Sequence, residues 1–260
     1  MGMQISQDLV GSPLRPYCIE VSWRNTMNYA AAIDDHNPHY FDDERESGVV
    51  APPMFSVAVT WPISERIEEY INTEDLSRQI MDTKLHYTEH LEFHRIIKPC
   101  DKVTIQGEIA AIFPHRDGTH LVVRYEAIQD EGTSVFTEHI GFFLRGVKCT
   151  GSGRGENVLQ KAPRFEGHEN LIWKTLIPVD LMRPYIYDGC TNIFFPIHTS
   201  KKFAHQVGLS GTILQGTATL AYAVRELINR ASDENPLNLR SVCCRFTAMV
   251  FPGTHILVQL

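Results

Sequence analysis

The sequence lacks any uninterrupted apolar run that approaches the length of a membrane span. Its first residues, 1–17, read MGMQISQDLVGSPLRPY and contain no continuous apolar segment of the kind found in secretory signals. The hydropathy pattern therefore predicts neither a membrane-spanning segment nor a membrane partner. We expect a cytoplasmic protein.

Long runs of positive charge are also missing. The 260-residue chain has 24 Lys and Arg against 31 Asp and Glu, so its formal net charge is −7 at pH 7. A nucleic-acid-binding surface normally needs a concentration of basic side chains. The charge pattern therefore argues against a nucleic-acid partner, and the apolar fraction of 43% is typical of a globular protein.

Closely spaced cysteines are absent too. Disulfide scaffolds and zinc sites normally use cysteines a few residues apart, so we expect reduced thiols that are mostly buried. The six cysteines are scattered as Cys18, Cys100, Cys149, Cys190, Cys243 and Cys244.

The twelve histidines do not form a metal-binding pattern on a predicted helix. His86, His90 and His94 lie four residues apart, but in a segment that alternates like a strand. On a regular strand they would share one face at a spacing of about 13 Å, which is too far to hold one ion. We therefore expect no metal site.

Alternation of apolar and polar residues predicts an antiparallel sheet. The longest alternating region covers residues 84–147 and is broken only by short turn segments. Shorter segments predict strands at 17–22 and 171–179 and a strand pair within 239–260.

Two apolar segments predict helices. Residues 56–71 suit a buried helix in which Pro62 lies near a boundary or causes a bend. Residues 208–230 predict a long helix that follows a turn marked by Gly208 and Gly211. Helices packed on an antiparallel sheet indicate the α+β fold class.

The chain shows signs of an internal duplication. Residues 37–40 align with 195–198, and residues 92–107 align with 245–260. The small polar residues 149–157 predict a linker between the two repeats. We expect one repeat at 1–150 and a second at 151–260.

The second repeat is shorter than the first. Nothing in it corresponds to residues 108–148, which supply the last predicted strands of the first repeat. We expect the chain to be a fragment of a longer sequence. The alternative is a small second sheet that another subunit covers, because a long open sheet edge promotes association.

Residues 187–225 look most like a functional site. They combine a predicted loop carrying Pro196 and His198, the glycine turn, and the start of a buried helix. Unpaired N–H groups at a helix start favour an oxygen that gains negative charge. A histidine beside such a helix start can transfer protons close to an oxyanion, although His198 could equally be a structural loop residue.

This segment resembles the MaoC-like, or hydratase-2, family of acyl dehydratases. The family motif is roughly Y-x-G-D-x-N-P-x-H, followed further along the chain by P-I-L-H-G at the start of the central helix of a hot-dog fold. Here Pro196, Ile197 and His198 match the end of the first motif. In the second motif Ile213, Leu214 and Gly216 match, and Gln215 replaces the usual histidine. The resemblance implies a double hot-dog, in which each antiparallel sheet wraps a central helix.

The match to the motif is incomplete. The family's catalytic aspartate falls on Ile193, and its asparagine falls on Phe195. Asn192, one position out of register, could place the water but could not accept its proton. Asp188 is ionisable, but it precedes His198 by ten residues.

The first repeat carries a degenerate copy of the motif. Residues 35–40, DHNPHY, keep Asp35, Asn37 and Pro38 but have Tyr40 where the histidine would stand. Asp35 and Asn37 could form a second site. They could also brace the loop, because such side chains commonly bond nearby backbone groups.

The resemblance implies a hydratase/dehydratase that adds water reversibly to a 2-enoyl-CoA. His198 and Asn192 would be the catalytic residues, and Gly216, Gln215 and Gly211 would contact the substrate. No cofactor is implied beyond the coenzyme A of the acyl-CoA substrate, and we expect a homo-oligomer. The alternatives are a hot-dog acyl-CoA thioesterase and a non-catalytic subunit that binds acyl thioesters.

Overall fold

The computed structural model describes residues 2–129, 132–155 and 171–260. The strands are β1 (Gln4–Ser6), β2 (Pro13–Glu20), β3 (Lys84–Phe93), β4 (Lys102–His115), β5 (Gly118–Gln129), β6 (Ser134–Arg145), β7 (Lys148–Thr150), β8 (Arg154–Gly155), β9 (Lys174–Val179), β10 (Ser241–Arg245) and β11 (Thr254–Gln259). The α-helices are α1 (Trp23–Ala32), α2 (Pro38–Phe41), α3 (Phe55–Glu65), α4 (Ile67–Tyr70), α5 (Arg78–Met81), α6 (Arg183–Thr191), α7 (Lys201–Gln206) and α8 (Gly216–Ala231). Short 3-10 helices cover Gln7–Leu9 and Pro236–Asn238.

One large sheet dominates the fold. Its strands follow the order β10-β3-β6-β5-β4-β2, with β8 paired to β4. Strands β3 to β6 form the antiparallel meander predicted for residues 84–147. The predicted strand at 17–22 begins earlier, as β2, and its register against β4 shifts between Leu14 and Tyr17. Pro16 lies at this shift, where its missing N–H is tolerated because β2 is an edge strand.

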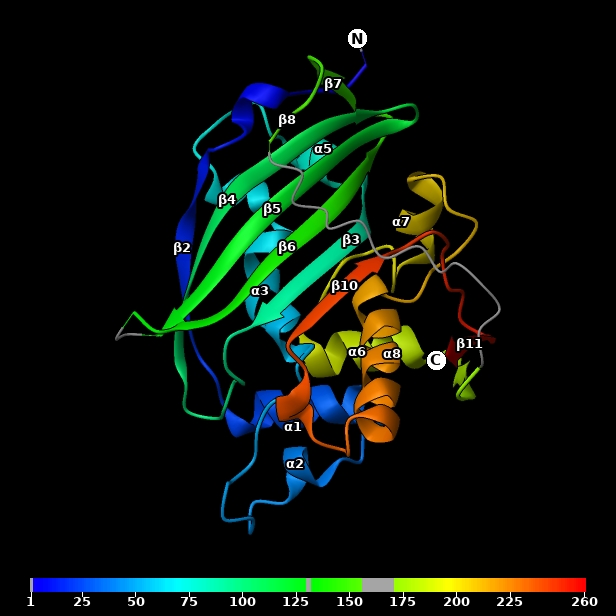
Figure 1. The fold of residues 1–260 in the computed structure, drawn as a ribbon. Coiled ribbons are helices and arrows are strands. Elements are labelled where there is room, and N and C mark those ends of the chain that lie inside the picture. The colour runs from blue at the N-terminus through cyan, green and yellow to red at the C-terminus, as the bar shows by residue number, and fades with distance from the viewer. Residues whose placement is uncertain (1, 130–131, 156–170) are drawn as a thin grey trace.

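Helix α3 packs behind the sheet (Figure 1). Val57, Val59 and Ile63 are fully buried, because this helix has apolar residues on nearly every side. Pro62 lies inside α3, one turn before its end, where only a few backbone bonds depend on its position. The predicted helix over 56–71 therefore divides into α3 and the short α4.

The second half supplies strands to two different sheets. β10 extends the large sheet by pairing with β3, whereas β11 pairs with β9 in a separate two-stranded sheet. The two strands predicted within 239–260 therefore form, but they do not pair with each other. The pairing of β10 with β3 ends at Phe246, whose backbone N–H donates to the Tyr87 carbonyl. The chain then turns at Gly253, which has a φ of 85°, before it enters β11.

Two boundaries near the predicted site also differ from expectation. Residues 183–191 form α6 rather than a loop, because Pro184 suits the first turn of a helix. Helix α8 begins at Gly216 rather than at residue 208. Gly208 has a φ of 81° and directs the chain out of α7 into the loop that leads to α8.

The two halves meet through equivalent helices. Helix α1 of the first half lies against α6 of the second, as Figure 1 shows. The Tyr29 and Tyr187 hydroxyl oxygens are 3.1 Å apart, and both side chains are completely buried. Each half also contributes one central helix, α3 or α8, so the arrangement is the double hot-dog that the duplication predicts.

The described part of the predicted linker at 149–157 is not extended coil. β7 pairs in parallel with β1, and β8 pairs with β4, so this segment is tied to the first half by backbone bonds. Residues 156–157 of the predicted linker lie outside the described residues. Among the helices that the structure describes, none has the length and apolar character needed to cross a membrane.

Candidate active site

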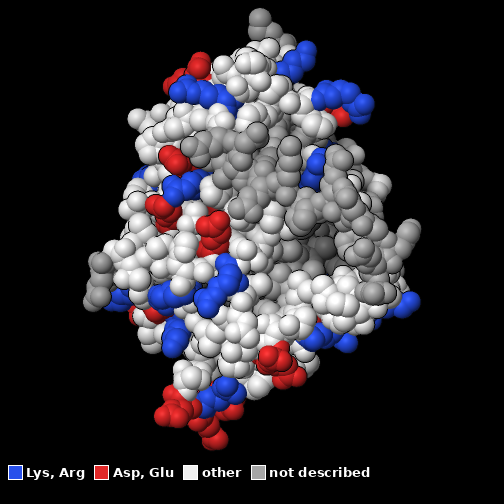
Figure 2. Space-filling model, in the orientation of Figure 1, with Lys and Arg blue, Asp and Glu red and all other residues white. Residues whose placement is uncertain are grey.

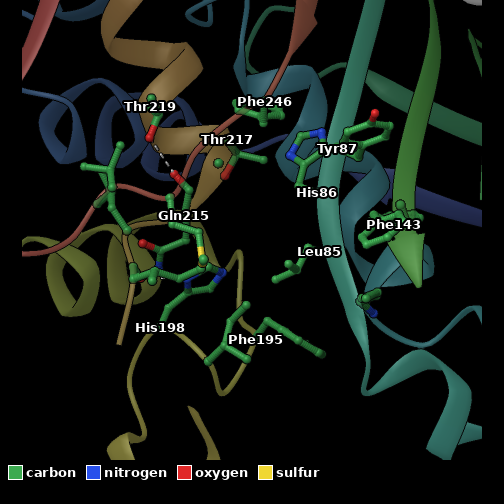
Figure 3. Close-up of a pocket in the computed structure, with 18 of the residues that line it drawn as sticks. Leu85, His86, Tyr87, Phe143, Phe195, His198, Gln215, Thr217, Thr219 and Phe246 are labelled. Atoms are coloured by element: carbon green, nitrogen blue, oxygen red, sulfur yellow. Dashed lines mark hydrogen bonds between the residues drawn. The ribbon is translucent and has the colours of Figure 1, made fainter. Parts of the chain in front are cut away.

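A cavity of about 250 Å³ lies between the start of α8 and the first residues of β3 (Figure 3). Most of its walls are apolar, and they come from both halves of the chain. The lining residues are Trp61, Lys84, Leu85, His86, Tyr87, Phe142, Phe143, Ile193, Phe195, Ile197, His198, Ile213, Leu214, Gln215, Gly216, Thr217, Thr219, Phe246, Thr247, Ala248, Met249 and Val250. Such a cavity suits a ligand with an apolar chain and one polar group.

His198 is fixed in one orientation. Its Nδ1 lies 2.8 Å from the carbonyl oxygen of Ile213, which can only accept a hydrogen bond. Nδ1 must therefore carry the proton, which leaves Nε2 of a neutral ring as an acceptor. The residue is only 7% exposed and lines the cavity (Figure 3). His198 and Gly216, which the sequence analysis assigned to one site, both line this cavity.

Burial controls the protonation of His198. Desolvation lowers its pKa from 6.5 to about 4, outweighing the hydrogen bond to Ile213, which acts in the opposite direction. At neutral pH the ring is therefore uncharged, and Nε2 is free to accept a proton from water.

Gly216 begins α8 beside the same cavity. The helix has no side-chain cap on its first N–H groups, so these donors remain available to a ligand. A Cβ atom built on Gly216 would lie 3.2 Å from His86 Nδ1 and 3.3 Å from His86 Cβ. A Cβ here would therefore force the helix start or the His86 ring to shift by a few tenths of an ångström.

Gln215 precedes the helix as its N-cap. Its Nε2 donates to the Pro184 carbonyl at 2.9 Å, which fixes the side chain. Oε1 is buried in the cavity wall and has no hydrogen-bond partner among the described residues. This oxygen is available to a bound water or a ligand hydroxyl.

His86 and Glu89 are features that sequence reasoning missed. His86 Nε2 lies 2.8 Å from Glu89 Oε2, and both side chains face the interior. The predicted row of His86, His90 and His94 on one face was wrong, because the register of β3 against β6 shifts between His86 and Thr88. The carboxyl group of Glu89 lies close to that of Glu138, and burial raises the pKa of both.

Lys84 forms part of the cavity wall without being free to react. Its Nζ donates to the carbonyl oxygens of Ser64 at 2.9 Å and Glu65 at 2.7 Å, at the end of α3. It also lies over the Phe195 ring at 4.7 Å from the centroid. Burial lowers its pKa to about 7. These contacts explain how a lysine that is 3% exposed is accommodated.

The structure does not bring Asn192 to His198. Asn192 ends α6 in a left-handed conformation with a φ of 58°, and its side chain is exposed. Gly211 likewise does not line the cavity, and a Cβ on it would meet nothing within 4 Å. Ile193 does line the cavity, so the expected aspartate position is occupied by an apolar side chain. Asp188 is not among the lining residues.

Asp35 and Asn37 lie away from this cavity, against the end of α8. Asn37 Nδ2 donates to Asn229 Oδ1 at 2.9 Å and to the Glu234 carbonyl at 2.7 Å. Asn229 Nδ2 in turn donates to Asp35 Oδ1 at 2.9 Å. The two side chains thus tie the α1–α2 loop to the second half. The local backbone bonds of the brace alternative are also present, because Asp35 Oδ1 accepts from the Asn37 amide at 3.1 Å and Asn37 Oδ1 accepts from the His39 amide at 3.0 Å.

Within residues 2–129, 132–155 and 171–260, no cluster of His, Cys, Asp and Glu has the arrangement of a metal site.

On the face shown in Figure 2, outside the grey residues, basic and acidic side chains are interspersed rather than separated into a basic patch.

The fold and cavity define a double hot-dog protein with a buried histidine at the start of a central helix. Residues 177–260 match the MaoC like domain, and residues 8–138 match the FAS1-like dehydratase domain region. The chain belongs to the MaoC-like dehydratase family.

Two relatives illustrate the sequence similarity. Peroxisomal multifunctional enzyme type 2 of Drosophila melanogaster is 24% identical, and the match covers 90% of this chain but 39% of the fly protein. The 3-hydroxyacyl-thioester dehydratase Y of Mycobacterium tuberculosis is 26% identical, over 96% of this chain and 85% of the relative. The chain thus spans well under two thirds of the fly relative's length.

Solved structures show the same fold. The MaoC-like dehydratase from Phytophthora capsici superposes with a TM-score of 0.79 at 18% identity, covering 96% of this chain and 86% of the other. A Mycobacterium tuberculosis protein described as having a double hotdog fold superposes with a TM-score of 0.62 at 14% identity, covering 95% of this chain and 82% of the other.

Proposed function

We propose that this protein is an acyl-thioester hydratase/dehydratase that adds water reversibly to a 2-enoyl-CoA. The observation that carries the proposal is the position of His198, whose acceptor nitrogen belongs to the same apolar cavity as the uncapped start of α8. The names of the relatives, a 3-hydroxyacyl-thioester dehydratase and enoyl-CoA hydratases, support the same reaction class.

In the hydration direction, Nε2 of His198 accepts a proton as water adds to the β-carbon. The electron pair of the double bond moves toward the thioester carbonyl, whose oxygen gains negative charge. The amide N–H of Gly216 stabilises this oxygen, and loss of one such donor typically costs about 3–4 kcal/mol. Oε1 of Gln215 can accept the other hydrogen of the attacking water.

The thioesterase alternative is less compatible with the cavity. Hot-dog thioesterases use a carboxylate near the start of the central helix. Among the described residues that line this cavity, none is Asp or Glu. A non-catalytic acyl-binding subunit would need the apolar walls but would have no use for a fixed acceptor on His198.

Turnover of crotonyl-CoA by the purified chain distinguishes these functions. We expect loss of the enoyl absorbance, formation of 3-hydroxybutyryl-CoA and no release of free coenzyme A. By family analogy the product has the (R) configuration. Release of free coenzyme A with unchanged enoyl absorbance would indicate a thioesterase, and binding without turnover would indicate a non-catalytic subunit.

Three further features belong to this proposal. The thioester itself accepts the electron pair, so the reaction calls for no redox cofactor and no metal.

We also propose a cytoplasmic location and a homo-oligomeric state. Size-exclusion chromatography with light scattering would test the oligomeric state.

A further inference from the structure

A β-bulge in β3 places His86 on the inner face of the large sheet. His86 pairs with Phe142 and Thr88 pairs with Gly141, so Tyr87 is an extra residue between two adjacent partners. In a regular strand, residues three apart would point to opposite faces. The extra residue reverses this relationship and brings His86 and Glu89 to the same face.

The ring of His86 lies between Glu89 and the cavity. Its Nε2 is 2.8 Å from Glu89 Oε2, and its side chain is 9% exposed. Its Nδ1 lies toward Gly216, 3.2 Å from the position that a Cβ on Gly216 would occupy. Both ring nitrogens are buried and have no hydrogen-bond partner among the described residues, so Nε2 and Glu89 are in close contact without a formed hydrogen bond. The ring is also held by Phe246, with the two centroids 4.5 Å apart.

The geometry points to His86 as a second proton-transfer residue of this site, with Glu89 behind it as the relay that supplies its proton. This inference rests on the proposed hydration. Addition of water requires two proton transfers, one from the water to a base and one from an acid to the α-carbon, and His86 would supply the second. Ile193 occupies the position of the family's aspartate and can do neither.

The directions of the pKa shifts agree with this assignment. Burial raises the pKa of Glu89 well above its ordinary value and lowers that of His86 to about 3. These opposite directions favour the carboxyl group over the ring as the holder of the proton between them. The relay requires Nε2 to accept from Glu89 across the 2.8 Å contact and Nδ1 to carry the ring proton toward the cavity.

The proton transfers balance. His198 Nε2 takes a proton from water, the hydroxide adds to the β-carbon, and the resulting enolate takes the Nδ1 proton of His86 at the α-carbon. His86 remains neutral because Glu89 gives its proton to Nε2. The cycle closes when the proton on His198 returns through water in the cavity to His86 Nδ1 and on to Glu89.

The two sides of the cavity thus have complementary roles. His198 presents an acceptor nitrogen from the loop between α6 and α7, and His86 presents Nδ1 from β3 (Figure 3). The proximity of the rings is reflected in the electrostatic effect of His86, which contributes to the lowered pKa of His198. The two groups therefore act on different atoms of one bound substrate.

The test compares His86→Gln and Glu89→Gln with wild type and with His120→Gln. Glutamine at position 86 can keep the contact with Glu89 but has no counterpart of Nδ1. His120 is a matched control, because it is also a buried histidine of this sheet, is bonded to Thr88 and lies outside the cavity. Butyryl-CoA, which cannot be hydrated, measures binding by calorimetry.

Crotonyl-CoA is hydrated in D2O, and NMR reads the configuration of the deuterium at the α-carbon. We expect wild type and His120→Gln to place deuterium on one face. In His86→Gln, kcat should fall by about 10²–10⁴-fold, butyryl-CoA should bind as in wild type, and the residual product should carry deuterium on both faces. Glu89→Gln should lower kcat without affecting butyryl-CoA binding.

Three results would overturn the assignment. Wild-type kcat in both variants would show that neither residue transfers a proton. Reduced kcat together with weaker butyryl-CoA binding and single-face deuterium would show that His86 only shapes the cavity. Absence of hydration by wild type would remove the proposed function and this relay together, whereas the first two results leave the proposed function standing.

Discussion

The Nδ1 atom of His198 lies 2.8 Å from the carbonyl oxygen of Ile213. His198 precedes α7 in the chain and Ile213 follows it, so the bond joins the loop after α6 to the loop before α8. It fixes both the ring and its tautomer, because a carbonyl oxygen cannot donate. The orientation of the base is thus built into the same loop that delivers Gly216 to the cavity.

The activity should persist to unusually low pH for a histidine base. Burial lowers the pKa of His198 from 6.5 to about 4, so its neutral form predominates down to about pH 4. We expect the acid limb of kcat/KM for crotonyl-CoA hydration to have its midpoint near 4. A midpoint near 6.5 would mean that the ring is solvated in the working enzyme. The profile should be measured only where circular dichroism shows native protein.

The lowered pKa of His198 should also make the folded state less stable at acidic pH. Because the folded pKa of His198 is lowered, the unfolded chain binds its proton first as the pH falls. The contribution of neutral His198 to folding is complete above pH 6.5 and is lost as the pH falls from 6.5 to 4. Urea unfolding of wild type and His198→Asn across this range should show a smaller loss in the variant.

Gly216→Ala should reduce turnover. The new methyl group would stand 3.2 Å from His86 Nδ1, so the helix start or the ring must shift. If the shift removes one oxyanion donor, kcat should fall by about 10²–10³-fold. Gly189→Ala is a suitable control, because a Cβ there meets nothing within 4 Å and the site lies on exposed α6 surface. Equal rates in both variants would contradict the role of the Gly216 amide.

Asn37→Ala tests whether the first-half motif braces the fold or forms a second site. The substitution removes the hydrogen bonds that Asn37 donates to Asn229 and Glu234 and the one that its Oδ1 accepts from the His39 amide. It should lower the free energy of unfolding by about 1–3 kcal/mol, while the hydration rate per folded molecule stays near that of wild type. Loss of turnover without loss of stability would instead favour a second site.

Glu138→Gln should change how stability depends on pH. Burial and the nearby Glu89 raise the pKa of Glu138 well above 4.5. A raised folded pKa means that the contribution to stability is complete below the ordinary pKa and is lost as the pH rises through the folded value. Wild type should therefore lose more stability than the variant as the pH rises above 4.5. Chemical unfolding would measure this, and parallel curves would contradict it.

The parts of the fold that local pattern controls could be predicted from the sequence. The alternation of residues 84–147 fixes which side chains face the core, so the meander of β3 to β6 was confirmed. His198 and Gly216 could be singled out because each belongs to a short local motif, His198 with Pro196 and Gly216 with Ile213 and Leu214. Long-range pairing was less accessible, and nothing local indicates that β10 joins β3 while β11 joins β9.

The site was only partly predictable, because it also depends on backbone features that the local alternation does not show. His86 and Glu89 share a face only because of one extra residue in β3, and regular alternation places them on opposite faces. The backbone turn at Asn192, with its φ of 58°, carries that side chain away from the cavity, although its position in the sequence suggested a partner for His198.

The most direct test of the account is the rate of crotonyl-CoA hydration by wild type and His198→Asn at neutral pH. Asparagine can still donate to the Ile213 carbonyl, but it lacks the acceptor nitrogen on the cavity side. The account predicts that kcat falls by about 10²–10⁴-fold while butyryl-CoA binds with unchanged affinity. A variant that hydrates crotonyl-CoA at the wild-type rate would contradict the central role of His198.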